Sequence, residues 1–191
     1  MWGLKMTPEI PELSAQLTVL IDAENIQAKI KELGNRIAND YKGKQLHLIG
    51  ILKGACFFLA DLIRYLPRDT TLDFMAVSSY NERRQSSGEV RIVKDLESAI
   101  QGREVLIVED ILDTGLTLDY LSRCLWARGP KSLNICALLS KPSRRIKEVA
   151  ATYVGFEIPD EFVVGYGLDD AERFRNLSTI SIISKNWKAG Y

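Results

Sequence analysis

Three carboxylates and a short turn stand together after a run of apolar residues. Glu109, Asp110 and Asp113 follow the apolar stretch 105–108, and residues Thr114 to Thr117 come next. Carboxylates this close repel one another unless a ligand or a cation compensates their charge. The backbone N–H groups and hydroxyls of the turn could surround a phosphate where the next helix begins. A ligand that meets both groups should carry hydroxyls or a metal ion beside its phosphate.

The expected secondary structure places these residues at one edge of a sheet. Apolar runs predict strands at 46–52, 72–80, 105–110 and 133–140, with a further candidate at 162–166. Apolar spacing predicts helices that begin after Asp22, run through 55–66 and extend from about Leu116 to Ala127. Alternating strands and helices predict an α/β fold with a mostly parallel sheet flanked by helices. Ligands bind beyond the carboxyl ends of such strands, where the three carboxylates lie.

The composition limits the classes of function. The chain has 191 residues, which fits one domain, and its 25 basic and 25 acidic residues give a formal net charge of zero. Nothing global attracts the chain to nucleic acid or an anionic membrane, so we expect neither partner. Without an apolar stretch of membrane-spanning length or a signal peptide pattern, we expect a cytoplasmic protein. Cys56, Cys124 and Cys136 have apolar neighbours and are expected to be buried thiols.

Several segments carry a resemblance to a known family. VLIVEDILDTGLTL resembles the phosphoribosyl pyrophosphate motif of type I phosphoribosyltransferases, and is most similar to the hypoxanthine-guanine branch. GILKGACFFLADL, SSY, LLSKPSRR and VGFEIPDEFVVGYGLDDAERFRNL are also similar, in the family order, and the matches cover most of residues 46–177. The resemblance implies one phosphoribosyltransferase domain over 1–191, with a small hood formed by the N-terminal segment and residues about 150–191. It also implies a homodimer or homotetramer.

The implied reaction is a step of purine salvage. Phosphoribosyl pyrophosphate would give its 5-phosphoribosyl group to a 6-oxopurine, hypoxanthine and also guanine, to form IMP or GMP and pyrophosphate. Asp113 would be the catalytic residue that manages the proton of the purine's imidazole ring. Glu109 and Asp110 would receive the ribose hydroxyls and, through water, Mg²⁺, and Asp169 would bind a second Mg²⁺ with pyrophosphate. The other implied phosphoribosyl pyrophosphate positions are Thr114, Gly115, Leu116 and Thr117 for the 5′-phosphate, and Leu52, Lys53, Gly54 and Arg175 for pyrophosphate.

The resemblance also implies how the base is recognised. Lys141 can only donate hydrogen bonds, which favours the oxygen of an oxopurine over the amino group of adenine. Phe162 would stack on the purine, Val163 would contribute backbone groups, and Asp169 lies in the same subsite. Ser79 and Tyr80 would begin a lid over the reacting centre. The family often has a cis peptide before the loop lysine, here the Leu52–Lys53 bond.

Simpler interpretations stay open for individual residues. Asp113 could be a helix N-cap, Lys141 a surface lysine, Phe162 a core aromatic and the basic run RRIK a solvated face. Leu116, Asn81 and Asp170 depart from the family pattern, and their effect is open. Two other functions remain: a phosphoribosyl pyrophosphate-sensing regulator that binds RNA or DNA on the same fold, and a transferase for adenine, orotate or uracil.

Overall fold

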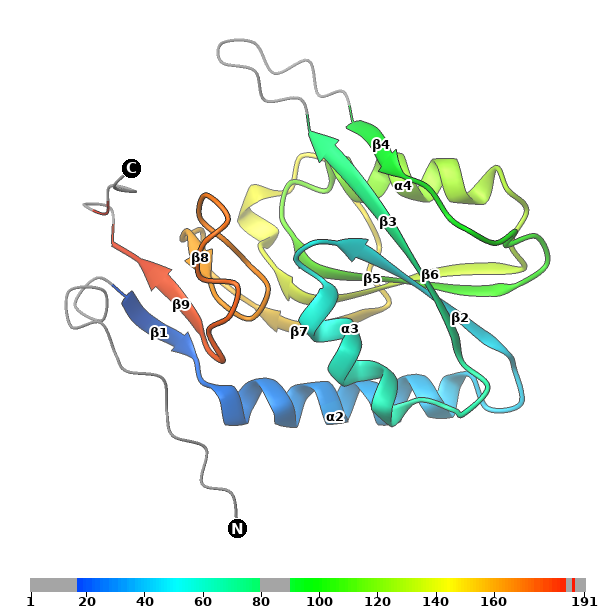
Figure 1. Ribbon diagram of the computed structural model, residues 1–191, viewed down its shortest axis with the longest axis horizontal. Coiled ribbons are helices and arrows are strands. Elements are labelled where there is room, and N and C mark those ends of the chain that lie inside the picture. Colours follow the sequence, from blue (N-terminus) through cyan, green and yellow to red (C-terminus); the bar gives the residue numbers. More distant parts are fainter. Residues whose placement is uncertain (1–16, 80–89, 185–186, 188–191) are drawn as a thin grey trace.

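The computed structural model describes residues 17–79, 90–184 and 187, which form two sheets and their covering helices (Figure 1). The strands are β1 (Leu17–Ile21), β2 (Leu46–Leu52), β3 (Thr71–Ser79), β4 (Val90–Lys94), β5 (Glu104–Leu112), β6 (Ser132–Ser140), β7 (Tyr153–Glu157), β8 (Val163–Val164) and β9 (Ile180–Ile183). The α-helices are α2 (Ala23–Asp40), α3 (Cys56–Leu62) and α4 (Leu116–Trp126), and the 3₁₀ helices are η1 (Ile63–Tyr65) and η2 (Pro142–Arg144).

The large sheet has the strand order β4-β3-β2-β5-β6-β7. The pairs β2–β3, β2–β5, β5–β6 and β6–β7 are parallel, and only β4 at the edge is antiparallel to its neighbour β3. The predicted mostly parallel sheet is therefore confirmed. From β2 the chain continues to β3 on one side and later to β5 on the other, so the strand order reverses between β2 and β5.

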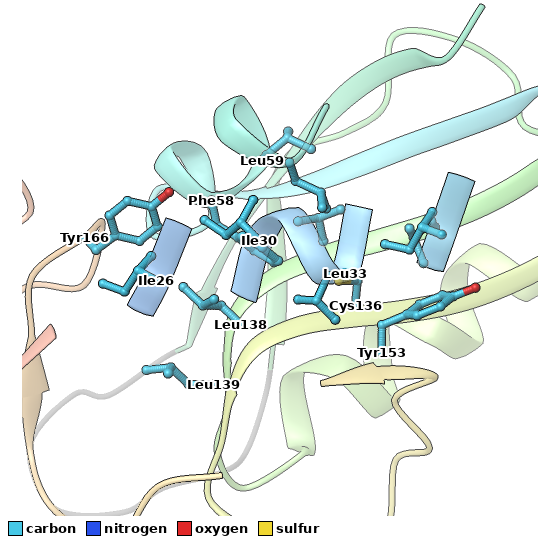
Figure 2. Close-up of a cluster of buried hydrophobic side chains, with 14 of the residues drawn as sticks. Ile26, Ile30, Leu33, Phe58, Leu59, Cys136, Leu138, Leu139, Tyr153 and Tyr166 are labelled. Atoms are coloured by element: carbon cyan, nitrogen blue, oxygen red, sulfur yellow. The ribbon is translucent and has the colours of Figure 1, made fainter. Parts of the chain in front are cut away.

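Alternating strand positions supply two hydrophobic cores, one on each face of the large sheet. On one face, α2 and α3 pack mainly on even-numbered residues of the central strands, such as Cys136 and Leu138, although Leu139 also joins this cluster (Figure 2). On the other face, α4 packs on the odd-numbered residues. The helices contribute Ile26, Ile30, Leu33, Ile37, Phe58 and Leu59 to the first core and Leu118, Leu121 and Leu125 to the second. Burial on both faces explains why the central strands are almost continuously apolar.

The helix predictions are close to the observed bounds. Asp22 caps α2 as predicted, because its Oδ1 accepts a hydrogen bond of 2.8 Å from the backbone N–H of Asn25. The segment predicted as one helix over 55–66 divides into α3 and η1 and ends before Pro67. α4 begins at Leu116 and ends one residue before the predicted Ala127.

Of the strands in the small sheet, β1 and β9 were not predicted. β1, β9 and β8 form a separate sheet in the order β1-β9-β8, and β1 and β9 pair antiparallel from Leu17↔Ile183 onward. The candidate strand at 162–166 is only β8, within this small sheet. β3 and β4 pair antiparallel up to Ser79↔Val90, and the residues between them, 80–89, lie outside the described residues.

The burial of the cysteines differs from the prediction. Cys136 is buried, but Cys124 is partly buried and Cys56 is exposed. Cys56 opens α3, and its neighbour Phe57 is also exposed because this short helix turns one side to solvent. No helix among the described residues has the length and hydrophobicity to cross a membrane.

Asp73 of β3 anchors the connection between β4 and β5. The side chain is 6% exposed, its Oδ1 accepts from the N–H of Phe74 at 2.7 Å, and its Oδ2 accepts from the N–H groups of Glu97 at 2.7 Å and Ser98 at 3.3 Å. Burial raises the pKa of Asp73, but these three N–H donors and Lys94 outweigh it and lower the pKa below its ordinary value.

Asp73→Asn should lower the free energy of unfolding by about 1–3 kcal/mol at pH 7, because the amide cannot accept all three N–H bonds. A carboxyl group with a lowered pKa in the folded state stabilises the protein above its unfolded pKa, near 4, and loses that contribution as the pH falls further. Urea unfolding between pH 7 and pH 2 tests this. The variant's stability should decline less steeply below about pH 4 than that of the wild type, and parallel declines would contradict the assignment.

Candidate active site

The site lies at the carboxyl ends of β2 and β5, where the strand order reverses. The Leu52–Lys53–Gly54 turn leaves β2, and the Leu52–Lys53 peptide is cis, as the family resemblance led us to expect. β5 does not end at the carboxylates but continues beyond Glu109 and Asp110 to Leu112. Both carboxylates therefore sit on ordered strand backbone, which fixes their direction more firmly than a loop would.

The pair of carboxylates is electrostatically unfavourable. Glu109 is 9% exposed, and burial together with the adjacent Asp110 raises its pKa well above the ordinary value. Burial also raises the pKa of Asp110 to about 6, against the opposing effects of the Ile111 N–H and Arg175. A cation placed here would remove both the repulsion and part of the desolvation cost.

The oxygen ligands of Glu109 and Asp110 suit Mg²⁺, which keeps several water or substrate ligands, better than a metal ion that is bound only by protein side chains. Among the described residues, no group of three or more His, Cys, Asp or Glu side chains is arranged to hold a metal ion. Mg²⁺ prefers oxygen ligands and commonly uses one or two carboxylates with waters and substrate phosphates. Glu109 and Asp110 fit that mode, since two buried carboxylates supply oxygen ligands and unbalanced charge.

Two glycines let three chain segments approach one another at the site. A Cβ atom on Gly54 would lie 1.6 Å from Oδ2 of Asp110, so any side chain there would displace this carboxylate. A Cβ atom on Gly167, whose φ is +102°, would lie 2.1 Å from the carbonyl oxygen of Gly54. Because neither glycine has a side chain, three segments can lie close together at the site: the end of β5, the turn after β2 and the loop after β8.

Charged side chains tie the loop after β8 to the same turn. Nζ of Lys53 lies 2.8 Å from Oε2 of Glu172. Arg175 donates to the carbonyl of Gly167 at 2.7 Å and forms an ion pair of 2.8 Å with Asp169. The structure therefore brings the predicted residues Lys53, Arg175 and Asp169 into one connected group.

The predicted phosphate turn precedes α4. Gly115, with φ +83°, occupies the N-cap position, and no side chain caps the helix, so the interpretation of Asp113 as N-cap is wrong. Oγ1 of Thr114 accepts from the N–H of Leu116 at 3.5 Å. A pocket of about 240 Å³ opens here; its lining includes Glu109, Asp110, Asp113, Thr114, Gly115 and Thr117, but not Leu116. All but one of the predicted residues of this turn meet at one pocket.

A second pocket, of about 330 Å³, adjoins the first and shares Asp110, Ile111 and Asp113 with it. Its lining also includes the predicted base-binding residues Lys141, Phe162, Val163 and Asp169. Phe162 is 55% exposed, so its interpretation as a core aromatic is wrong.

Lys141 is buried at the end of β6, with only 7% of its surface exposed, so its interpretation as a surface lysine is also wrong. Its backbone N–H donates to the carbonyl of Leu112 at 3.0 Å, which fixes the residue beside β5. Its ammonium has no hydrogen-bond or ion-pair partner among the described residues. The residue lines the second pocket, where an acceptor atom of a ligand could bind this ammonium.

Sequence reasoning missed the partner of Asp113. Nε of Arg144 lies 2.8 Å from Oδ1 of Asp113, and Nη1 of the same arginine lies 3.4 Å from Oδ1 of Asp160. Both partners and Arg144 line the second pocket. The basic run RRIK beside Lys141 was the available signal, and we had interpreted it as a solvated face.

The structure does not test the predictions for Ser79, Tyr80 and Asn81. Tyr80 and Asn81 lie outside the described residues, and of Ser79 only the backbone is described. The departure at Asp170 is accommodated locally, because its Oδ2 accepts from Nε1 of Trp187 at 2.8 Å.

Comparisons with known proteins agree with this geometry. The family model of the phosphoribosyl transferase domain matches residues 18–171. The hypoxanthine-guanine phosphoribosyltransferase of Mycobacterium tuberculosis H37Rv is 54% identical over 172 residues, covering 87% of this chain and 85% of that protein. The enzyme of the same name from Bacillus subtilis 168 is 52% identical over 165 residues, with coverages of 86% and 92%.

A solved structure of a hypoxanthine phosphoribosyltransferase from Staphylococcus aureus superimposes with a TM-score of 0.87 at 47% identity. The match covers 94% of this chain and 97% of that one. Sequence, fold and the residues gathered at the switch point of the sheet thus lead to one conclusion: the chain belongs to the phosphoribosyltransferase family, in its hypoxanthine-guanine branch.

Proposed function

We propose that the chain transfers the 5-phosphoribosyl group from phosphoribosyl pyrophosphate to hypoxanthine or guanine and releases pyrophosphate. The observation that carries this proposal is the buried, unpartnered Lys141 in a pocket with the exposed Phe162. That pocket meets the carboxylate and threonine pocket at Asp110 and Asp113, so a planar base and a sugar phosphate can lie next to each other. The expected cytoplasmic location and homodimer or homotetramer stay predictions.

Each substrate group has a matching set of residues. The 5′-phosphate would meet the turn Thr114 to Thr117, and the ribose hydroxyls would donate to Glu109 and Asp110. Pyrophosphate would lie between the Lys53–Gly54 turn and Arg175, whose guanidinium suits a bidentate contact with phosphate oxygens. Glu109 and Asp110 would hold one Mg²⁺, and Asp169 would hold a second together with pyrophosphate. Mg²⁺ would stabilise the negative charge that develops on the leaving group.

In this proposal, Asp113 would manage the proton of the base. The purine nitrogen forms a bond to the anomeric carbon as the bond to pyrophosphate breaks, and the imidazole ring must lose a proton. The carboxylate of Asp113, at the junction of the two pockets, would accept it. In the free protein this carboxylate accepts from Arg144, which keeps it directed toward the base pocket. The small sheet β1-β9-β8, with its adjoining loops, would form the hood that positions Phe162.

The two other functions receive less support. A transferase for adenine would place an amino donor against Lys141, which has no acceptor. A nucleic-acid-binding regulator would need a basic face, and the balanced charge of the chain gives no sign of one. One assay with hypoxanthine, guanine, xanthine, adenine, orotate and uracil tests the proposal. Turnover of adenine, orotate or uracil alone would refute it.

Asp113→Asn should lower turnover with hypoxanthine by about 100- to 10,000-fold, because an amide cannot take the purine proton. The affinity for phosphoribosyl pyrophosphate, measured by calorimetry with Mg²⁺, should stay close to the wild-type value. Asp119→Asn is the matched control, since Asp119 forms only a surface ion pair with Arg123. Near-normal turnover of Asp113→Asn would remove Asp113 from the chemistry.

Lys141→Ala should weaken purine binding more than phosphoribosyl pyrophosphate binding, because it removes the donor that recognises the oxo group. Lys131→Ala is the control at the opposite end of β6, where the exposed Lys131 forms an ion pair with the buried Glu104. Calorimetric titration of both substrates into both variants gives the comparison. Unchanged affinities in Lys141→Ala would exclude the residue from base recognition.

Gly54→Ala should weaken phosphoribosyl pyrophosphate binding by about tenfold or more, since the new methyl group displaces the Asp110 carboxylate. Gly43→Ala provides the control, because Gly43 has φ +76° but nothing within 4 Å of a built Cβ atom. It should cost stability through backbone strain without changing affinity. Equal affinities in the two variants would show that the approach of Gly54 to Asp110 has no part in binding.

A further inference from the structure

The segment after Lys141 contacts the phosphate turn from behind. Nη1 of Arg145 donates to the carbonyls of Leu112, at 3.0 Å, and of Asp113. Nη2 of the same guanidinium donates to Oγ of Ser140 at 2.9 Å. The carbonyl of Thr114 accepts from the N–H groups of the next two residues, 146 and 147, at 2.9 and 3.0 Å. Three consecutive carbonyls, 112 to 114, are thus held by 145–147, which we call the strap.

Holding these carbonyls also directs the N–H groups of the turn. In a trans peptide the C=O and N–H of one unit point in opposite directions, and the only cis peptide in the described chain is Leu52–Lys53. The N–H groups of residues 113 to 115 must therefore point away from the strap. The strap residues do not line the pocket of about 240 Å³, whereas the turn does, which supports a pocket-facing direction for these N–H groups.

The strap and the turn are fitted closely. A Cβ atom on Gly115 would lie 2.3 Å from the carbonyl oxygen of Lys147 and 3.3 Å from Cδ of Arg145. A glycine is therefore favoured at position 115 for two reasons: a side chain would clash with the strap, and φ is +83°. Arg145 is partly buried, and its guanidinium donates from Nη1 to two carbonyls and from Nη2 to a hydroxyl, whereas an ammonium has its three donors on one nitrogen.

We propose that Arg145 is a positioning residue for the reaction: it orients the phosphate turn so that successive backbone N–H groups face the 5′-phosphate. It also links the turn to Ser140, next to Lys141, and so sets the distance between the phosphate site and the base site. Arg145 touches no substrate in this assignment and acts through the backbone of residues 112 to 114. The inference rests on the proposed role of residues 114–117 in phosphate binding.

The test compares full-length variants by calorimetry with Mg²⁺ and phosphoribosyl pyrophosphate, and by steady-state kinetics. Arg145→Met should weaken phosphoribosyl pyrophosphate binding by about 10- to 100-fold, as expected for a displaced binding group. KM for phosphoribosyl pyrophosphate should rise accordingly, with a smaller effect on KM for hypoxanthine. Arg145→Lys retains one donor nitrogen and should recover part of the affinity, which also provides the test if the methionine variant does not fold. Arg123→Met, at an exposed ion pair on α4, is the matched control.

Thr117→Ala separates failure of this inference from failure of the proposed function. Weaker binding in Thr117→Ala but wild-type binding in Arg145→Met and Arg145→Lys would overturn the role of Arg145 and leave the phosphate site in place. Wild-type binding in all three would overturn the phosphate role of the turn and the inference with it. A loss in Arg145→Met with partial recovery in Arg145→Lys, and none in Arg123→Met, supports the proposal.

Discussion

The approach of Gly54 to Asp110 is the constraint on which the site depends. A carboxylate oxygen occupies the space that a side chain at Gly54 would take, and the carbonyl of Gly54 in turn occupies the space of a side chain at Gly167. Groups that belong to β5, to the turn after β2 and to the region after β8 thereby come within reach of one small ligand. The contact between Gly167 and Gly54 is one of backbone atoms, which do not adjust by changing rotamers, whereas the contact at Gly54 involves the side chain of Asp110.

The same closeness creates the electrostatic character of the site. Glu109 is buried and Asp110 is partly buried, and this burial raises the pKa of both carboxyl groups. On the other side of the crevice, Arg175 is shared between Asp169 and the backbone of Gly167, and Lys53 is paired with Glu172. A ligand with both hydroxyls and phosphates can bind the carboxylates with its hydroxyls and the cationic side chains with its phosphates. A simple anion would bind only the cationic side chains.

Much of this could be predicted from sequence because it is local. The apolar runs of β2, β5 and β6 and the periodicity of α2 and α4 predicted the parallel sheet, and the strand ends then placed Glu109 and Asp110 at its edge. The strap could not be predicted, because Arg145 reaches carbonyls 32 and 33 residues away, and nothing in its neighbours indicates that direction. The exposure of Cys56 was also missed, because apolar neighbours indicate burial only when the helix has both sides covered.

The pairing of β1 with β9 has a consequence for the order in which the protein can be completed. Leu17 pairs with Ile183, so the two strands come from opposite ends of the described chain. Since β1 has β9 as its only neighbour in the sheet order of the described strands, it has no strand partner while the chain is being synthesised on the ribosome. The large sheet can assemble first, because its strands lie between residues 46 and 157. Closure of the small sheet has a long sequence separation and requires β9, so it can only follow the synthesis of the strands of the large sheet.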